Sequence, residues 1–77
     1  MQPEMQAVGS SLVKEAGYGE EKKELWVRLH EGGLYVYSDV PREVFKEMLS
    51  GGSVGRYFVQ KIKREYHGRR ADEGGVY

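Results

Sequence analysis

The 77-residue sequence predicts one α+β domain, in which a three-stranded antiparallel β-meander is followed by two helices packed on one face of the sheet (β-β-β-α-α). Up to residue 39, apolar and polar residues largely alternate with the period of two that is typical of half-buried strands. From Pro41 onward the apolar residues instead recur every three or four positions, as they do on an amphipathic helix. Because a chain of this length supports one small core, both helices should share one side of the sheet.

The strand part of the sequence divides into three apolar segments separated by turn-forming residues. We expect strands at residues 12–18, 25–30 and 34–39. The charged residues 19–24 and the glycines within residues 31–33 suit the two hairpin connections. The second strand should have an aliphatic face and a mixed face, formed by Leu25, Val27 and Leu29 and by Trp26, Arg28 and His30, respectively.

The first helix is expected directly after the third strand. Pro41 suits a first helical turn because its missing N–H would be unpaired there, and Asp39 is a candidate N-cap. Apolar residues then follow at helical spacing: Val44, Phe45, Met48 and Leu49. Gly51 and Gly52 are expected to end this helix.

The second helix should begin after Ser53, which is a good N-cap residue. Apolar residues spaced four apart form one stripe along it: Val54, Phe58, Ile62 and Tyr66. We expect this stripe to pack on the sheet. The resulting domain would span residues 8–67, between an N-terminal tail at residues 1–7 and a polar C-terminal tail at residues 68–77.

The formal net charge is zero, yet the charges are unevenly distributed along the chain. Residues 56–70 contain six basic side chains and a single acidic one, Glu65. Local rather than net charge decides where a polyanion can dock. The candidate nucleic-acid contacts are therefore Arg56, Lys63, Arg64, Arg69 and Arg70. The same pattern also suits a solvated helix face with cations near the helix C-terminus.

The residue types argue against an enzyme. The chain has no cysteine, and His30 and His67 do not have the spacing of metal ligands. None of the serines lies in a nucleophile motif, so we expect no catalytic residue, no metal and no cofactor. No apolar segment is long enough to span a membrane and no secretory signal is evident, so we expect a cytoplasmic protein without a membrane partner.

Three aromatic residues allow two interpretations. Tyr35 and Tyr37 share one face of the third strand, where they could stack on the bases of a single-stranded nucleic acid or line the core under the helices. Leu34 and Val36 lie on the opposite face, so the sheet is apolar on both sides. Trp26 is either an anchor for a partner or a residue that packs flat on the outer side of the sheet, under the N-terminal segment.

Three segments in order, "SSLVKEAGY", "LWVRLHEGGLYVYSDVP" and "SVGRYFVQKIKREY", resemble the KTSC domain family, which is named for its occurrence at the C-terminus of some lysyl-tRNA synthetases. The matching positions are Tyr35, Tyr37, Val40, Pro41, Ser53, Gly55, Tyr57, Phe58, Ile62 and Tyr66. The chain departs from the family pattern at Val59, where asparagine is common, and at Gly19, where aspartate is frequent. The resemblance implies a domain without enzymatic activity, and the synthetase connection suggests RNA binding.

The sequence thus favours a small non-catalytic binding domain that contacts RNA or another nucleic acid through the basic C-terminal helix. The alternative is a protein-binding regulator, which a phage could encode, of a nucleic-acid enzyme such as RNA polymerase or an aminoacyl-tRNA synthetase. Its partner would be a protein of transcription or translation. Such a regulator would use Trp26, Tyr35 and Tyr37 as interface anchors, because binding hot spots are enriched in tryptophan and tyrosine.

Overall fold

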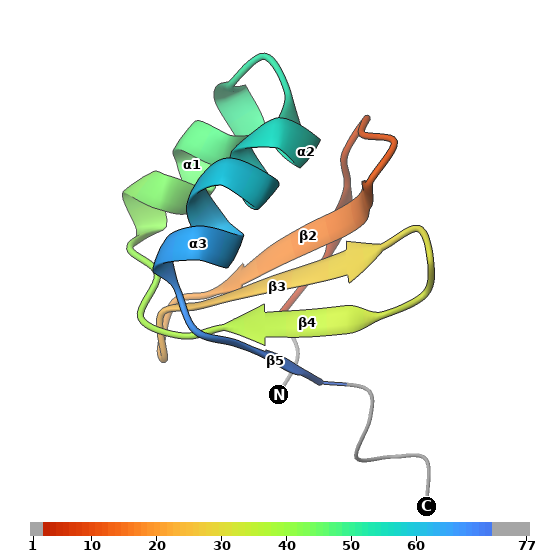
Figure 1. The fold of residues 1–77 in the computed structure, drawn as a ribbon. Coiled ribbons are helices and arrows are strands. Elements are labelled where there is room, and N and C mark those ends of the chain that lie inside the picture. The colour runs from red at the N-terminus through yellow and green to blue at the C-terminus, as the bar shows by residue number, and fades with distance from the viewer. Residues whose placement is uncertain (1–2, 72–77) are drawn as a thin grey trace, which may run out of the picture.

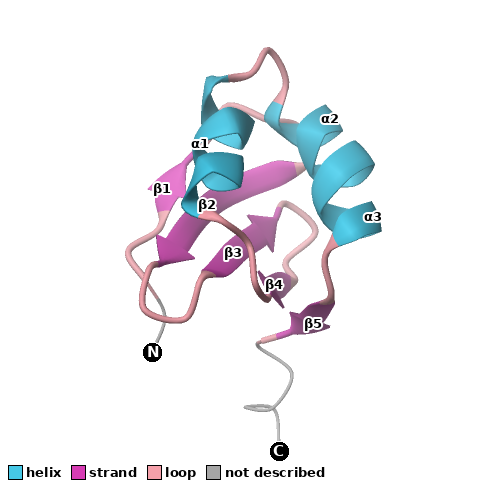
Figure 2. Ribbon diagram, turned by 90° about the vertical axis from the view of Figure 1, so that its left-hand side faces the viewer, coloured by secondary structure: helices cyan, strands magenta, loops and turns pink. Residues whose placement is uncertain are grey.

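An antiparallel sheet with strand order β1-β2-β3-β4-β5 forms one layer of the protein, whose computed structural model describes residues 3–71. The strands are β1 (Gln6–Ala7), β2 (Val13–Gly19), β3 (Glu24–Leu29), β4 (Leu34–Tyr37) and β5 (Gly68–Arg70). The helices form the second layer, over one face of this sheet (Figure 1), and the view turned by 90° shows the same two layers (Figure 2). The α+β class and the placement of the helices on one face agree with the prediction.

The sheet has five strands instead of the three expected. The two additional strands are β1 and β5, and both come from residues that the sequence assigned to the tails; residues 1–2 and 72–77 of those tails lie outside the described part. β5 continues the ladder of β4 at both ends: the Ser38 N–H donates to the His67 carbonyl (3.1 Å) and the Ala71 N–H to the Leu34 carbonyl (2.7 Å). Strands of two and three residues are too short to show an alternating pattern.

Two helical segments follow β4, as predicted. The first is α1 (Arg42–Ser50). The second runs without interruption through α2 (Val54–Tyr57), the π-helical turn η1 (Phe58–Ile62) and α3 (Lys63–Glu65). In η1 the Lys63 N–H donates to the Phe58 carbonyl, five residues earlier, where an α-helix would use a carbonyl four residues earlier.

The π turn keeps the apolar stripe of this helix on the sheet. In an α-helix, residues spaced four apart overshoot a full turn by about 40° at each step. A turn with more residues per revolution rotates the stripe back, because the same four residues then cover less than a full turn. Phe58 and Ile62 are accordingly buried, and Val54 and Tyr66 pack against the same core.

The helix caps agree with the sequence in one case and differ in the other. The Ser53 hydroxyl accepts a hydrogen bond from the Arg56 N–H (3.2 Å), so Ser53 is the N-cap that was expected. Asp39 does not cap α1: the N-cap position is Pro41, which provides no side-chain cap hydrogen bond. Asp39 instead takes a left-handed conformation (φ 57°) in the turn after β4, which an aspartate tolerates better than most residues.

The core lies between the helices and one face of the sheet. Leu25 and Val27 of β3 are fully buried under Phe58 and Ile62, as the alternation predicted. The Tyr37 ring meets Phe58 edge to face, with 5.6 Å between ring centroids. Among the described residues, this buried cluster contains Val13, Ala16, Leu25, Val27, Tyr37, Val40, Met48, Phe58 and Ile62.

Gly68 provides a test of β5, because a Cβ added there would lie 2.3 Å from the ring of the buried Tyr37. We expect Gly68→Ala to lower the free energy of unfolding by about 1–3 kcal/mol, since either the ring or the strand must move. Urea denaturation gives this value. Gly52→Ala is the matched control, because an added Cβ there meets nothing within 4 Å. Equal stability of both variants would contradict the packing of β5 against Tyr37.

A second test concerns the contact between the helices, where the Tyr57 hydroxyl donates to Glu47 Oε1 (2.8 Å). Burial, with the hydrogen bond and charge of Glu47 adding to it, raises the pKa of Tyr57 to about 12. Since an unfolded tyrosine titrates near 10, the folded state holds this proton more tightly. Its contribution to stability is therefore present below pH about 10 and is lost as the pH rises towards 12.

We therefore expect the free energy of unfolding of Tyr57→Phe to decline less steeply between pH 10 and 12 than that of the parent protein. Urea denaturation at several pH values measures this decline. Glu47→Gln should lower the pKa of Tyr57, because it removes the negative charge of Glu47, which is one cause of the raised pKa. Absorbance at 295 nm reports this pKa. If the free energy of unfolding of the parent and of Tyr57→Phe changes identically with pH, the raised pKa of Tyr57 is contradicted.

Candidate functional site

Three of the predicted nucleic-acid contacts lie on the last helical segment and point to solvent. Arg56 is on α2, and Lys63 and Arg64 are on α3; all three are exposed. Among the described residues none of them forms an ion pair. Lys61 differs from them, because it pairs with Glu65 one turn later (3.4 Å). The helix thus offers cations whose charge is not compensated by a neighbouring carboxylate.

The two remaining predicted contacts lie on opposite faces of the sheet. Arg69 and Arg70 are neighbours in β5, and successive strand residues point to opposite sides. Arg70 lies on the helix-covered face, where its guanidinium carbon is 5.8 Å from the centre of the Tyr35 ring. Arg69 lies on the outer face and pairs with Glu24 (3.5 Å). The structure therefore brings Arg70 to the helix side and separates Arg69 from the other cations.

The two tyrosines of β4 share the helix-covered face, but they differ in accessibility. Tyr37 is 6% exposed and belongs to the core, so it is not available as a partner-binding residue or a stacking platform. The reason is that the helices cover the end of β4 at which Tyr37 lies. Tyr35 is half-buried and carries the Arg70 side chain over its ring. One of the two expected platform rings therefore remains accessible.

Trp26 lies on the outer face of the sheet, opposite the helices. Its cross-strand neighbour is Gly17, and an added Cβ on Gly17 would lie 2.6 Å from the Glu4 carbonyl oxygen and 2.8 Å from Met5 Sδ. The N-terminal segment thus crosses this face beside Trp26, whose side chain is half-buried. Trp26 Nε1 is buried and has no hydrogen-bond partner among the described residues. The packing interpretation of Trp26 agrees with this arrangement better than an open partner surface does.

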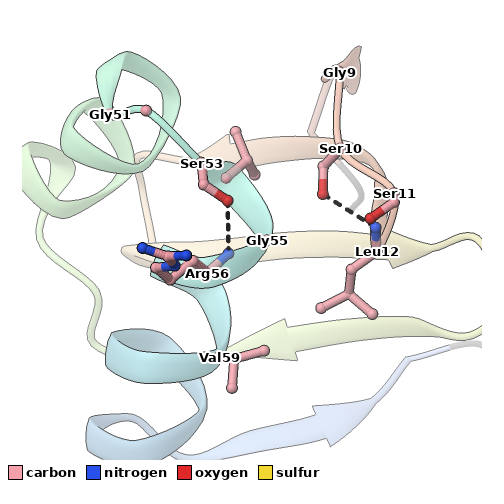
Figure 3. Close-up of a pocket in the computed structure, with 11 residues that line it drawn as sticks. Gly9, Ser10, Ser11, Leu12, Gly51, Ser53, Gly55, Arg56 and Val59 are labelled. Atoms are coloured by element: carbon pink, nitrogen blue, oxygen red, sulfur yellow. Dashed lines mark hydrogen bonds between the residues drawn. The ribbon is translucent and has the colours of Figure 1, made fainter.

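A groove that the sequence analysis did not predict lies between the β1–β2 connection and the start of the last helix (Figure 3). It is lined by residues 9–12, residues 51–56 and Val59, and has a volume of about 590 Å³. Gly55 allows the two walls to approach, because a Cβ there would lie 2.9 Å from Ser10 Oγ. The glycine and serine content of both segments was the only sequence feature that could have indicated the groove. Each segment alone, however, is typical of a turn.

Hydrogen bonds hold one wall of this groove in place. The Ser10 hydroxyl accepts from the N–H groups of Leu12 (3.1 Å) and Val13 (3.2 Å). His30 makes two contacts with the same connection. Its main-chain N–H donates to the Leu12 carbonyl (3.0 Å), and its ring Nε2 lies 2.8 Å from the Ser10 carbonyl oxygen. Because a carbonyl can only accept, Nε2 carries the proton in this contact. The wall is therefore ordered by the β3–β4 hairpin beside it.

Neither a metal site nor a membrane-spanning element is found in residues 3–71. No group of three or more histidine and carboxylate side chains is arranged to hold a metal ion there. The described helices are all too short or too polar to cross a bilayer.

Comparison with known proteins identifies the fold independently. A crystal structure of a KTSC domain protein from Yersinia pestis superposes with a TM-score of 0.84 and 31% sequence identity, covering 88% of this chain and 96% of that one. A protein from Tsukamurella paurometabola is 42% identical over 62 residues, which are 80% of this chain and 92% of that protein. A protein from Stutzerimonas stutzeri is 38% identical over 61 residues, with 79% and 86% covered.

The family of KTSC domains matches this sequence from residue 9 to residue 66. This range begins in the wall of the groove and ends with the last residue of the apolar stripe, Tyr66. On the combined evidence of sequence and fold, the chain belongs to the KTSC domain family.

Proposed function

We propose that the protein is a non-catalytic domain that binds RNA or another single-stranded nucleic acid through its last helical segment. The observation that carries the proposal is that Arg56, Lys63 and Arg64 are exposed and form no ion pair among the described residues. Arg70 adds a fourth cation on the helix side of the sheet, over the Tyr35 ring. RNA binding would place the protein in the cytoplasm, as the sequence predicts.

The cations favour contacts with phosphate over the reading of bases. Phosphates carry no sequence information, so contacts to them give affinity that varies little from one sequence to another. Each phosphate that a cation neutralises on a single strand releases counterions and steepens the salt dependence by about 0.7. Base stacking contributes less than expected from the sequence, because Tyr37 is in the core and only Tyr35 is accessible.

The alternative function, a protein-binding regulator, loses two of its three expected anchors. Tyr37 is buried and Trp26 lies half-buried beside the N-terminal segment. A different observation still favours protein binding: Leu12 and Val59, which line the groove, are exposed apolar side chains. This surface shares Arg56 with the nucleic-acid contacts but contains neither Lys63 nor Arg64, so variants of those two residues test nucleic-acid binding separately.

We expect the double variant Lys63→Gln/Arg64→Gln to bind a single-stranded oligouridine more weakly than the parent protein. The slope of log K against log salt should become shallower by about 1.4, because two phosphate contacts are lost. Fluorescence anisotropy at several salt concentrations measures both quantities. The fold should be retained, since both side chains are exposed and neither forms an ion pair with another described residue.

Lys46→Gln/Arg69→Gln is the matched control, because it removes the same net charge from exposed positions on α1 and on the outer face of the sheet. We expect it to keep nearly the parent affinity and the parent salt slope. If the two double variants lose affinity equally, binding follows net charge and does not use the helix. Parent affinity in a folded Lys63→Gln/Arg64→Gln variant would rule out α3 as the contact.

A further inference from the structure

The groove lined by residues 9–12, residues 51–56 and Val59 is the one place in the described chain where large apolar side chains are exposed. Leu12 is 37% exposed and Val59 is 44% exposed. They come from opposite walls and project towards the same space (Figure 3). Because scattered single apolar residues need no explanation but adjoining ones form a binding surface, their pairing in a groove indicates an apolar subsite.

Arg56 is the one charged residue among the described residues that line the groove, and its side chain extends to the side away from Leu12 (Figure 3). Arg56 forms no ion pair among the described residues, and no carboxylate is among the lining side chains. Ser53 accepts a hydrogen bond from the Arg56 main-chain N–H, and the Arg56 guanidinium itself forms no hydrogen bond among the described residues. A ligand with a carboxylate next to an aliphatic side chain would complement both features.

The main chain of the groove is accessible to an extended ligand. An added Cβ on Gly9 or Gly52 would meet nothing within 4 Å, so open space lies beside both residues. Backbone groups of Ser10 and Leu12 bond within the protein, whereas those of Gly9 and Gly52 form no hydrogen bond among the described residues, so an extended peptide would pair its backbone with these glycines. The volume of about 590 Å³ lies within the usual range of about 300–1,000 Å³ for ligand sites.

A nucleotide fits this groove less well than a peptide does. Single-stranded nucleic acids gain about 1–3 kcal/mol for each base stacked on an aromatic ring. Within residues 3–71 no aromatic residue lines the groove, and its apolar residues, Leu12, Val54 and Val59, are aliphatic. The lining therefore favours an aliphatic side chain over a base.

We propose that this groove is a docking site for an extended acidic peptide segment of a partner protein. The segment places a carboxylate at Arg56 and an aliphatic side chain between Leu12 and Val59. Arg56 is shared with the proposed nucleic-acid surface, whereas Lys63 and Arg64 lie outside the groove, so peptide binding does not depend on those two residues.

The test uses a set of fluorescein-labelled hexapeptides. Each peptide contains one glutamate and one leucine in a background of glycine and serine. The set covers every combination of positions for these two residues. Fluorescence anisotropy measures their binding to the full chain. We expect binding to depend on the spacing of the two residues, and to disappear when lysine replaces glutamate in the tightest peptide. Failure of every peptide in the set to bind would overturn the proposal.

Variants of the chain then locate the site. Val59→Ser and Leu12→Ser should each lower the affinity for the tightest-binding peptide about tenfold, because an exposed aliphatic contact is lost. Arg56→Gln should weaken it by a similar factor, and Lys46→Gln, a cation on α1 outside the groove, should not. Two apolar variants are used so that one remains informative if the other unfolds. Unchanged peptide affinity in folded Val59→Ser and Arg56→Gln variants would contradict the site.

The two binding functions separate in the same set of proteins. Val59→Ser should keep the oligouridine affinity of the parent, because it changes no charge. Lys63→Gln/Arg64→Gln should keep the peptide affinity. If the protein binds the peptide but not RNA, the peptide site is supported and the nucleic-acid proposal is contradicted. If it binds RNA but none of the peptides, the nucleic-acid proposal is supported and the peptide site is contradicted.

Discussion

Phe58 and Ile62 set the position of the candidate contacts on the last helical segment. Both side chains are fully buried between the last helix and the sheet, and burial of each contributes about 1.5–3 kcal/mol. Because they lie on one side of the helix, the rotation of the helix about its own axis is fixed. Arg56, Lys63 and Arg64 must then point away from the core. The distribution of charge on the surface is thus a consequence of apolar packing.

The same packing explains why the chain after the helix joins the sheet. Tyr66 packs against the core at the end of the helix, and the chain then runs along β4. Gly68 lets it pass close to the Tyr37 ring, where a larger residue would collide. The polar residues 68–70 carry no apolar pattern of their own, and their strand forms because the preceding helix delivers them to an open edge. A sequence pattern cannot report this, whereas the alternation of residues 25–29 was sufficient to predict β3.

The candidate site was predictable to the extent that it depends on local periodicity. The spacing of four predicted the buried stripe, and with it the exposure of Lys63 and Arg64; the period of two predicted that Tyr35 and Tyr37 share a face. Which face the helices cover follows from topology, so the burial of Tyr37 was open. The groove joins segments about forty residues apart in the sequence, and neither segment alone indicates a site.

The central claim is that nucleic acid contacts the helix side of the molecule, and mapping of backbone amide shifts during titration with a single-stranded uridine octamer tests it most directly. The account predicts that the shifted resonances cluster on α2, α3 and the adjoining Arg70, and that they return towards their free positions as salt is added. Shifts centred on Trp26 and Glu24, on the outer face of the sheet, or no shifts at all at low salt, would contradict it.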